Sequence, residues 1–318
     1  MPDNGFGWAT CADEVMRGIE ISGKQVVLTG GSSGIGVETA RVLAAAGAEA
    51  VLGVRDVGKG EGALSDIAPD TRKRMHLLEL DLRNFDSIHA FASEISGPLD
   101  VFVANAGVSK TPDAHLPNGL DVRFATNHLG HFLLAHLLKG QMAGRNARIV
   151  VVSSAAHKGM PVRMDDLQWQ AREHFDGAAY AESKSANILF AQEANRLWSG
   201  LGITANAVLP GSVMTGLQRF HGDALKRQIG FINPDGSLNE MVKTTEQGAA
   251  TSAWAATSPD LEGKGGLVLE DCNIALPVGP DTHPWSGFDE AIADPEVARQ
   301  LWEHSLELLR DLAGYEPD

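Results

Sequence analysis

The sequence predicts an α/β fold, namely a Rossmann-type doubly wound sheet of about seven parallel strands with helices on both faces and a C-terminal helical extension. From Lys24 onward, short apolar runs alternate with longer helical patterns, as in a sheet with crossover helices. A glycine-rich stretch at residues 29–36 follows the first run and opens the first helical pattern. With 318 residues, 43% hydrophobic and 21% charged, the chain can bury a full core.

Residues 1–22 are expected to form an N-terminal packing segment ahead of the main domain, which spans residues 23–275. Thr10 and Asp13 resemble a capping box, and Gly18 is expected to end a short helix.

Seven apolar runs predict the strands of the main domain. They span residues 26–28, 51–54, 77–80, 99–103, 149–152, 203–208 and 267–269. Four helices are predicted between these strands, each followed by a glycine that can end it. The helices span residues 35–46, 87–95, 120–142 and 179–198, and the glycines are Gly47, Gly97, Gly144 and Gly200.

Residues 276–318 are predicted to form a Pro- and Gly-rich loop and a last helix. Asp294 is the expected N-cap, and Pro295 lies in the first turn, where a proline is well tolerated. The apolar positions of this helix are Val297, Leu301, Leu308, Leu309 and Leu312. We expect the helix to dock on the main domain or on a second subunit.

Charge and cysteine content narrow the possible partners. A net charge of −15 argues against nucleic acid, since a phosphate backbone requires concentrated Lys and Arg. Cys11 and Cys272 lack metal-ligand spacing, which favours a reduced, intracellular setting. Because the start has no signal-peptide pattern and no apolar stretch reaches ~20 residues, we expect a cytoplasmic protein with no membrane anchor.

The glycine-rich turn predicts a dinucleotide site. Gly30, Gly34 and Gly36, with Ser32, Ser33 and Ile35 among them, come directly after the first strand and open a helix. Backbone N–H groups and a helix N-terminus then face a pyrophosphate. The alternative is an ordinary tight turn between a strand and a helix.

The end of the second strand indicates which dinucleotide binds. An acidic residue there would accept the ribose 2′-hydroxyl, but Val54 occupies that position and Arg55 follows it. Because an arginine can clamp a 2′-phosphate, NADP is preferred, with NAD possible. A shift of the backbone would aim Asp56 at the ribose instead, and Arg55 could simply pair with Asp56 or Glu61.

Tyr180 and Lys184 indicate acid–base chemistry. Positions i and i+4 share a helix face, so the ammonium of Lys184 can lie near the Tyr180 hydroxyl. A nearby positive charge is expected to lower the pKa of the phenol from its usual value of about 10. Taken alone, the pair could also be an exposed helical pair.

In combination, these motifs resemble the short-chain dehydrogenase/reductase family over about residues 22–273. The matching motifs are Thr29-Gly30-xxx-Gly34-Ile35-Gly36, Asp81-Leu82, Asn105-Ala106-Gly107, Asn127, Ser154, Tyr180-xxx-Lys184 and Pro210-Gly211-Ser212-Val213-Met214-Thr215. The extended relatives that act on nucleotide sugars usually space their glycines differently.

Within the family, the chain is most similar to the retinol dehydrogenase and WW-domain oxidoreductase-like branch, which the light-dependent protochlorophyllide reductases also resemble. The similarity lies in residues 54–56, 127–134, 153–157 and 270–272, and in the lengthened stretch 154–180. Membrane-bound relatives carry an apolar anchor that this chain lacks, so retinoid specificity is not transferred.

The resemblance implies four catalytic roles. Tyr180 would be the general acid or base, and Lys184 would lower its pKa and hold the nicotinamide ribose. Ser154 would donate a hydrogen bond to the substrate oxygen, with Ser153 as a rival by one position. Asn127 would hold a water that links Lys184 to solvent, or would instead satisfy a buried backbone group.

The resemblance also implies further cofactor contacts. Asp81 and Leu82 would line the adenine, and Asn105, Ala106 and Gly107 would run along the adenosine ribose. Val213 and Thr215 would meet the nicotinamide amide and phosphate, in a motif that also supplies Pro210 and Gly211. Each of these could also be an ordinary loop end at the carboxyl edge of the sheet.

Four histidines, His128, His131, His136 and His157, invite a metal site. They lack accompanying acids or cysteines at ligand spacing, so we assign them structural or surface roles and predict no metal site. His157 is near enough to Ser154 in the sequence to touch substrate.

The segment at about residues 212–244 is rich in apolar residues and is expected to form a mobile substrate lid. With Met160, Val162, Leu167 and Trp169 it could line a bulky apolar pocket, or these four could pack as ordinary core.

The sequence therefore predicts an NADP(H)-dependent oxidoreductase acting on a lipophilic ketone, aldehyde or secondary alcohol. The alternatives are a non-catalytic cofactor-binding sensor or partner-binding protein, and a carbon–carbon double-bond reductase. A homodimer through the helices at 120–142 and 179–198 is possible, although the C-terminal extension could block larger assemblies.

Overall fold

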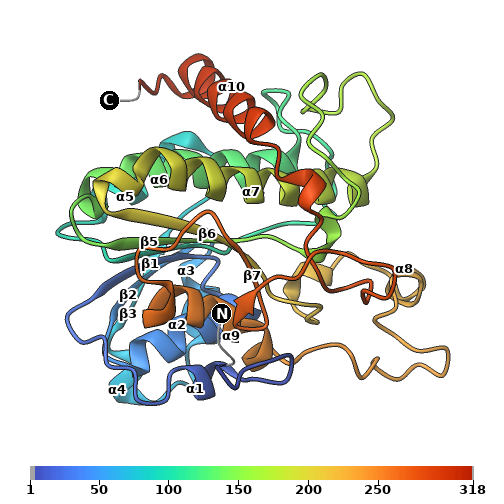
Figure 1. Ribbon diagram of the computed structural model, residues 1–318. Helices are drawn as coiled ribbons and strands as arrows, with labels where there is room; N and C mark the ends of the chain where they lie inside the picture. The colour runs from blue at the N-terminus through green and yellow to red at the C-terminus, as the bar shows by residue number, and fades with distance from the viewer. Residues whose placement is uncertain (1–3, 317–318) are drawn as a thin grey trace.

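The computed structural model describes residues 4–316 as one sheet between two layers of helices (Figure 1). The strand order is β3-β2-β1-β4-β5-β6-β7-β8. α5, α6 and α7 lie on one face, and α2 and α9 on the other. The hydrophobic core fills both layers, around Phe102, Phe132 and Phe190 on the first face and around Leu52 and Trp254 on the second.

The predicted parallel sheet is confirmed, with one short strand added. The strands are β1 Gln25–Thr29, β2 Glu49–Val54, β3 Met75–Glu79, β4 Val101–Ala104, β5 Ala147–Val152, β6 Ile203–Leu209, β7 Val268–Glu270 and β8 Asn273–Ile274. β8 pairs antiparallel with β7 through a turn in which Asp271 and Cys272 have positive φ angles of 50° and 58°. The sequence gives little sign of this turn, because cysteine is not among the residues that favour left-handed backbone.

The helices are α1 Ala12–Val15, α2 Gly34–Ala45, α3 Val57–Ala63, α4 Pro69–Arg72, α5 Phe85–Glu94, α6 Gly130–Met142, α7 Asp176–Trp198, α8 Asp223–Gln228, α9 Thr245–Thr257 and α10 Pro295–Ala313. The short helices are the π-helix η1 Phe124–Leu129 and the 3-10 helices η2 Ala155–His157, η3 Ser199–Leu201, η4 Gly216–Gln218, η5 Pro259–Leu261 and η6 Glu290–Ile292. The predicted helices α2, α5, α7 and α10 are confirmed, with ends shifted by a few residues. The prediction names no helix at α3, α4, α8 or α9.

The helix predicted at residues 120–142 is confirmed from Val122 onward, but its first part is π-helical. Asp121 forms an isolated bridge with His115, and its carboxylate accepts the backbone N–H groups of Arg123 and Phe124 at 2.8 and 2.9 Å. This carboxylate therefore caps the segment that leads into η1, and the π-helix η1 precedes α6. A π-helical turn inside an α-helix is frequently found at a functional site.

α9 is buried on nearly all sides, which explains why the periodicity of apolar residues does not reveal it. The consecutive residues Ala249, Ala250, Thr251 and Ser252 are all at most 2% exposed although they face different directions around the helix axis. Its start does carry a signal, since the Thr244 hydroxyl accepts the Gln247 N–H at 3.3 Å and the Gln247 side chain accepts the Thr244 N–H at 2.9 Å.

The predicted capping box at Thr10 and Asp13 is wrong. The N-cap of α1 is Cys11, whose backbone N–H donates to the Glu14 carboxylate at 2.8 Å. Thr10 instead accepts the Gly7 N–H, and Asp13 forms an ion pair with Arg41 at 2.7 Å. The described part of the N-terminal segment packs against the main domain, because the apolar residues of α1 belong to the same core cluster as α9.

α10 lies across α7 on the outer side of the sheet (Figure 1). The predicted cap is confirmed, since the Asp294 carboxylate accepts the Glu296 N–H at 2.8 Å and Pro295 occupies the first turn. Trp302 anchors the helix, with its ring centroid 4.8 Å from that of Phe132 and 5.2 Å from that of Trp198.

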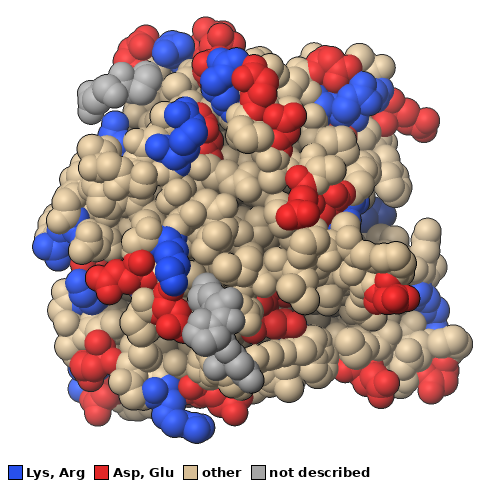
Figure 2. Space-filling model, in the orientation of Figure 1, with Lys and Arg blue, Asp and Glu red and all other residues tan. Residues whose placement is uncertain are grey.

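Acidic and basic residues are interspersed on the face of the molecule that Figure 2 shows, and the basic ones form no continuous patch there. Between residues 4 and 316, no helix has the length and hydrophobicity that crossing a bilayer requires.

Candidate active site

The glycine-rich turn and the loop after β4 lie in contact at the carboxyl edge of the sheet. Gly30 has a φ of +80°, and a Cβ added there would lie 3.0 Å from both the Ala106 Cα and the Asn105 Nδ2. Only glycine combines this left-handed backbone with so close an approach. The turn is therefore a cradle of bare backbone at the N-terminus of α2, which fits a pyrophosphate.

Thr29 holds this cradle together. Its hydroxyl oxygen accepts the backbone N–H groups of Asn105 and Ala106, each at 3.0 Å, and its carbonyl accepts the Asn105 side-chain amide at 2.8 Å. The Asn105 side chain, a predicted cofactor contact, is thus used to join β1 to β4. The backbone of Asn105, Ala106 and Gly107 lines the carboxyl edge of the sheet.

His131 connects Thr29 to the middle of η1. Its Nε2 lies 2.7 Å from the Thr29 hydroxyl oxygen, and its Nδ1 lies 3.0 Å from the Asn127 carbonyl oxygen. Because a carbonyl only accepts, Nδ1 carries the proton and Nε2 accepts from Thr29. Burial lowers the pKa of His131 to about 4, so the ring is neutral at physiological pH.

Asn127 satisfies buried backbone groups, which was the second of the two roles considered for it in the sequence analysis. Its side chain accepts the Val108 N–H at 2.8 Å, donates to the Val108 carbonyl at 2.9 Å, and donates to the Ser183 hydroxyl at 2.8 Å. A Cβ added to Gly107 would lie 3.4 Å from the Asn127 Oδ1 and 3.5 Å from the Lys184 Nζ. Asn127 and Lys184 therefore border the same point beside Gly107.

Tyr180 and Lys184 share a face of α7, with the Lys184 Nζ 5.8 Å from the centre of the Tyr180 ring. Lys184 is 3% exposed and donates to the Val152 carbonyl at 2.8 Å. Burial lowers the pKa of Lys184 to about 7. Burial also raises the pKa of the Tyr180 phenol, and its hydrogen bond with Ser154 offsets only part of that rise.

The expectation that Lys184 lowers the pKa of Tyr180 is therefore wrong for the side chains alone. An ammonium with a pKa of about 7 is only partly charged at neutral pH, and desolvation is the largest influence on the pKa of the phenol.

The structure separates the two candidate serines. Ser154 is the N-cap of η2, and its hydroxyl is hydrogen-bonded to Tyr180. Ser153 is 2% exposed and donates to the Lys184 carbonyl at 2.7 Å, which places it in the core. Of the two, Ser154 is the one that lies beside the phenol.

His157 does not face a substrate. It is fully buried, with its Nδ1 2.6 Å from the Ser154 carbonyl and its Nε2 accepting the Asp289 backbone N–H at 3.0 Å. Both ring nitrogens are used, so His157 ties the C-terminal loop to the end of β5. The other histidines named above are also buried, and no group of three or more metal-ligating side chains occurs in the described part of the chain.

A buried ionic network positions the start of α7, which the sequence reasoning missed. Arg123 is 0% exposed and donates to Asp176, the first residue of α7, at 2.8 Å. It also pairs with Asp121 at 3.2 Å, and Asp121 lies 2.8 Å from the His174 ring. The network fixes α7, and with it Tyr180, against the segment that carries Asn127.

Arg55 forms neither of the surface pairs considered for it. Asp56 caps α3 by accepting the Lys59 N–H at 3.0 Å, and Glu61 pairs with Arg72 at 2.6 Å. Arg55 is exposed at the end of β2. The same cap turns Asp56 toward α3, which leaves Arg55 as the polar residue available at this strand end.

Most of the remaining predicted cofactor residues have side chains that are already packed or paired within the protein. Asp81 pairs with Arg83 at 2.6 Å, and Leu82 is buried. Ile35 and Val213 both pack toward Gly248 of α9, so only their backbones reach the edge of the sheet. Three further groups follow the strand ends: Ser32 and Ser33 beside Gly34, Pro210 and Gly211 after β6, and Thr215, whose hydroxyl caps η4.

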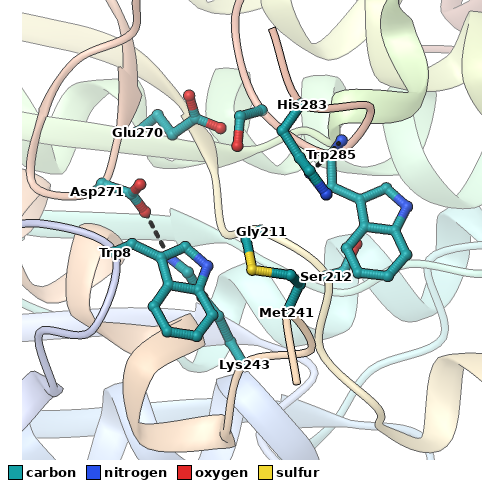
Figure 3. Close-up of a pocket in the computed structure, with 10 residues that line it drawn as sticks. Trp8, Gly211, Ser212, Met241, Lys243, Glu270, Asp271, His283 and Trp285 are labelled. Atoms are coloured by element: carbon teal, nitrogen blue, oxygen red, sulfur yellow. Dashed lines mark hydrogen bonds and ion pairs between the residues drawn. The ribbon is translucent and has the colours of Figure 1, made fainter. Parts of the chain in front are cut away.

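The two ends of the lid segment meet around a small cavity, which Ser212 and Lys243 both line (Figure 3). Lys243 forms an ion pair with Asp271, and Trp285 of the C-terminal loop packs on Phe231 with ring centroids 5.4 Å apart. Figure 3 shows the Trp8 and Trp285 rings on opposite sides of this cavity.

The long insert packs as core, the second of the two alternatives. Val162, Leu167 and Trp169 are each at most 8% exposed. They line a separate small cavity with Phe124 and Ser183, and none of its lining residues comes from residues 212–244. The predicted pocket shared by the insert and the lid is therefore wrong for these three residues.

Comparisons with known proteins agree with this geometry. Residues 24–225 match the family model of the short chain dehydrogenases. The chain is 42% identical over 296 residues to a Streptomyces lividans protein described as "Probable oxidoreductase", covering 92% of this chain and 99% of that protein. It is 38% identical over 296 residues to "Retinol dehydrogenase 12" of Mus musculus, covering 92% and 88% of the two chains.

A crystal structure of an uncharacterized protein from Mycobacterium Paratuberculosis matches with a TM-score of 0.69 and 30% identity. The match covers 92% of this chain and 95% of that one. All the predicted site residues, from Gly30 to Thr215, lie within the range that the family model matches.

Proposed function

The chain belongs to the short-chain dehydrogenase/reductase family, in its retinol dehydrogenase-like branch, and from that premise we propose that it is an NADP(H)-dependent oxidoreductase. The proposed substrate is a lipophilic ketone or aldehyde, or the corresponding alcohol. The bound nicotinamide would supply the hydride chemistry. We propose a cytoplasmic location for it, in keeping with the free thiols of Cys11 and Cys272.

The observation that carries the proposal is the convergence of Ser154, Tyr180 and Lys184 at one point of the sheet edge. The Ser154 hydroxyl is hydrogen-bonded to the phenol, and the Lys184 ammonium lies under the same ring. The bare backbone cradle at Gly30 and Gly34 lies at the same edge. A dinucleotide on this cradle would bring its nicotinamide end toward the three side chains.

Each side chain has a task in this proposal. Ser154 donates a hydrogen bond to the substrate oxygen and so polarises the carbonyl. Tyr180 gives its proton to that oxygen. Lys184 has three N–H donors, of which the Val152 carbonyl accepts one, so the others remain for a ribose.

The pKa directions favour reduction of a carbonyl. Because burial raises the pKa of Tyr180, the phenol holds its proton at neutral pH and is ready to donate it. In the opposite direction, a phenolate would have to form first, and the partly charged Lys184 gives it limited help.

Two features support the cofactor and substrate classes. Arg55 stands free at the end of β2, where a 2′-phosphate would lie. The lid exposes Phe220 by 44% and Leu238 by 53%, which gives it apolar groups to place over a lipophilic substrate.

A substrate panel tests this proposal. NADPH oxidation is followed with lipophilic ketones and aldehydes, with sugars and with charged acids, and NADH is run in parallel. We expect turnover of the lipophilic carbonyls and a preference for NADPH. Turnover confined to sugars or charged acids would contradict the substrate class, and equal use of NADH would contradict the role of Arg55.

A further inference from the structure

The lid begins in direct contact with the glycine-rich turn. A Cβ added to Gly34 would lie 2.8 Å from the Thr215 Cγ2, and one added to Gly216 would lie 3.4 Å from the Ser33 hydroxyl oxygen. The 3-10 helix η4 starts at this contact and ends one turn later at Arg219. The position of Arg219 is thereby linked to the turn that cradles the dinucleotide.

Arg219 is held in place by its own segment. Its Nη1 donates to the Gly216 carbonyl at 2.8 Å, and its guanidinium lies 5.0 Å from the centre of the Phe220 ring. These contacts orient the guanidinium but leave most of its N–H donors without a protein acceptor.

Arg219 and Arg55 carry like charges, and the acid that the charge of Arg55 reaches, Asp81, is already paired with Arg83. In the described residues 4–316, neither guanidinium lies within ion-pair distance of a carboxylate. The turn that the lid contacts also contacts β2, since the Gly30 N–H donates to the Gly53 carbonyl at 2.8 Å. Burial, and next the charge of Arg55, lower the pKa of Arg219. The neighbouring cation Arg83 differs, since it is paired with Asp81 at 2.6 Å.

Two unpaired guanidinium groups that face one region form a site for an anion with more than one negative charge. Arg55 lies at the end of β2, the strand end where a doubly wound fold meets the 2′ position of the adenosine ribose. The Ser33 hydroxyl, which does not cap α2, lies beside Gly216 at the start of the lid.

We infer that Arg219 of the lid is a second clamp, with Arg55, on the 2′-phosphate of NADP(H). The inference rests on the proposed use of this cofactor and adds a residue from a separate segment of the chain. The phosphate offsets the positive charge of both arginines, so its binding holds the start of the lid on the turn that it already contacts. Recognition of the 2′-phosphate and seating of the lid thereby become one event.

Calorimetry with adenosine fragments tests this clamp without turnover. Titration of the parent, Arg219→Gln and Arg55→Gln proteins with 2′,5′-ADP and with 5′-AMP isolates the contribution of the 2′-phosphate. We expect each substitution to weaken 2′,5′-ADP about tenfold and to change 5′-AMP less than twofold. The double variant should depart from the product of the two single losses, because both arginines act on one phosphate.

Arg227→Gln is the matched control. Arg227 lies in the same lid, but its guanidinium donates to the carbonyls of Asn233 and Pro234. This variant should bind both fragments as the parent does.

Proteolysis tests the link to the lid. NADP should protect the parent from trypsin cleavage after Lys226 and Arg227 more strongly than NAD does, and Arg219→Gln should abolish the difference.

The outcomes distinguish the clamp from the underlying proposal. An equal loss for 2′,5′-ADP and 5′-AMP in Arg219→Gln would place this arginine on the other phosphates and overturn the clamp. Unchanged binding in Arg219→Gln, with a selective loss in Arg55→Gln, would overturn the clamp and leave NADP preference standing. A parent protein that binds both fragments equally would refute both.

Discussion

Thr29 shows how a single hydroxyl can organise the site. It accepts two backbone N–H groups from the loop after β4 and donates to the neutral His131, which in turn donates to the Asn127 carbonyl. The cradle for a dinucleotide and the π-helix η1 before α6 are therefore joined through the side chain of Thr29, which is 0% exposed. The residue at position 29 must therefore supply a hydroxyl for these hydrogen bonds, and a side chain that only matches threonine in size cannot replace it.

Thr29→Val is expected to destabilise the fold although it keeps the shape of the side chain. The N–H groups of Asn105 and Ala106 would lose their buried acceptor, at a cost of about 1–3 kcal/mol for each group left unsatisfied. Urea unfolding monitored by fluorescence measures the change. Thr29→Ser retains the hydroxyl and serves as the control, and a valine variant as stable as the serine variant would contradict this assignment.

The pair Tyr180 and Lys184 shows where residue-level reasoning from sequence ends. Spacing alone places both side chains on one face of a helix, and the structure places them so. The sign of the pKa shift depends on burial, which the spacing does not reveal. For the same reason, the sequence did not distinguish a substrate contact from a buried tether at His157.

At the scale of elements, η1 and α6 carry three buried, neutral histidines, of which His128 and His136 contact α10. Burial lowers the pKa of His128 and His136 to about 3 and that of His131 to about 4. His136 has no hydrogen-bond partner on either ring nitrogen and lies among Phe132, Trp198 and Trp302. The interface between these helices therefore requires that His136 carry no charge.

The stability should fall as the pH decreases from about 6.5 toward 4. In that range the unfolded chain takes up protons on these histidines and the folded chain does not, which favours unfolding by up to about 4 kcal/mol per pH unit for three residues. Urea unfolding at pH 7, 6 and 5 measures the slope. His136→Phe should reduce it by about a third, and an unchanged slope in that variant would contradict the assignment of His136.

The elements differ in how well the sequence pattern predicts them. Six of the seven predicted strands contain consecutive buried residues, as strands covered by helices on both faces do, and runs of apolar residues reveal such strands directly. α9 is equally buried but consists mostly of small residues, so no face stands out. The π-helix η1 makes tertiary hydrogen bonds from Asn127 to Val108 and Ser183, which have no sequence pattern. The turn before β8 has left-handed backbone at Asp271 and Cys272, which has none either.

At the scale of the whole molecule, the C-terminal extension covers α7 and α6. Leu301 and Leu309 of α10 are at most 1% exposed, and Trp302 packs on both helices. These are the helices through which the sequence analysis considered a dimer. The extension occupies that side of the molecule as a second subunit would.

Deletion of residues 295–318 should expose this apolar surface and promote self-association. Light scattering measures the mass of the deleted form, which we expect to exceed that of a monomer. Trp302→Ala is the milder variant, and it should cost about 3–5 kcal/mol of unfolding free energy with the chain still intact. A deleted form that stays monomeric and as stable as the parent would contradict the role of α10 as a cover.

The motif residues that follow β1, β2, β4, β5 and β6 were predictable as a set, because such strand ends meet at one edge of a parallel sheet, whereas Asn127, Tyr180 and Lys184 lie inside helices. The contacts that place them were not. Arg123 fixes α7, His131 joins two loops, and Arg219 arrives from the lid, and each depends on residues more than 20 positions away in the sequence.

The central claim is that Tyr180 donates the proton beside a bound nicotinamide. Its most direct test compares the parent with Tyr180→Phe for single-turnover NADPH oxidation by a lipophilic ketone, with NADP affinity measured on the same samples. The account predicts that oxidation falls by at least about 100-fold while NADP affinity stays within twofold. Equal oxidation rates in the two proteins would contradict it.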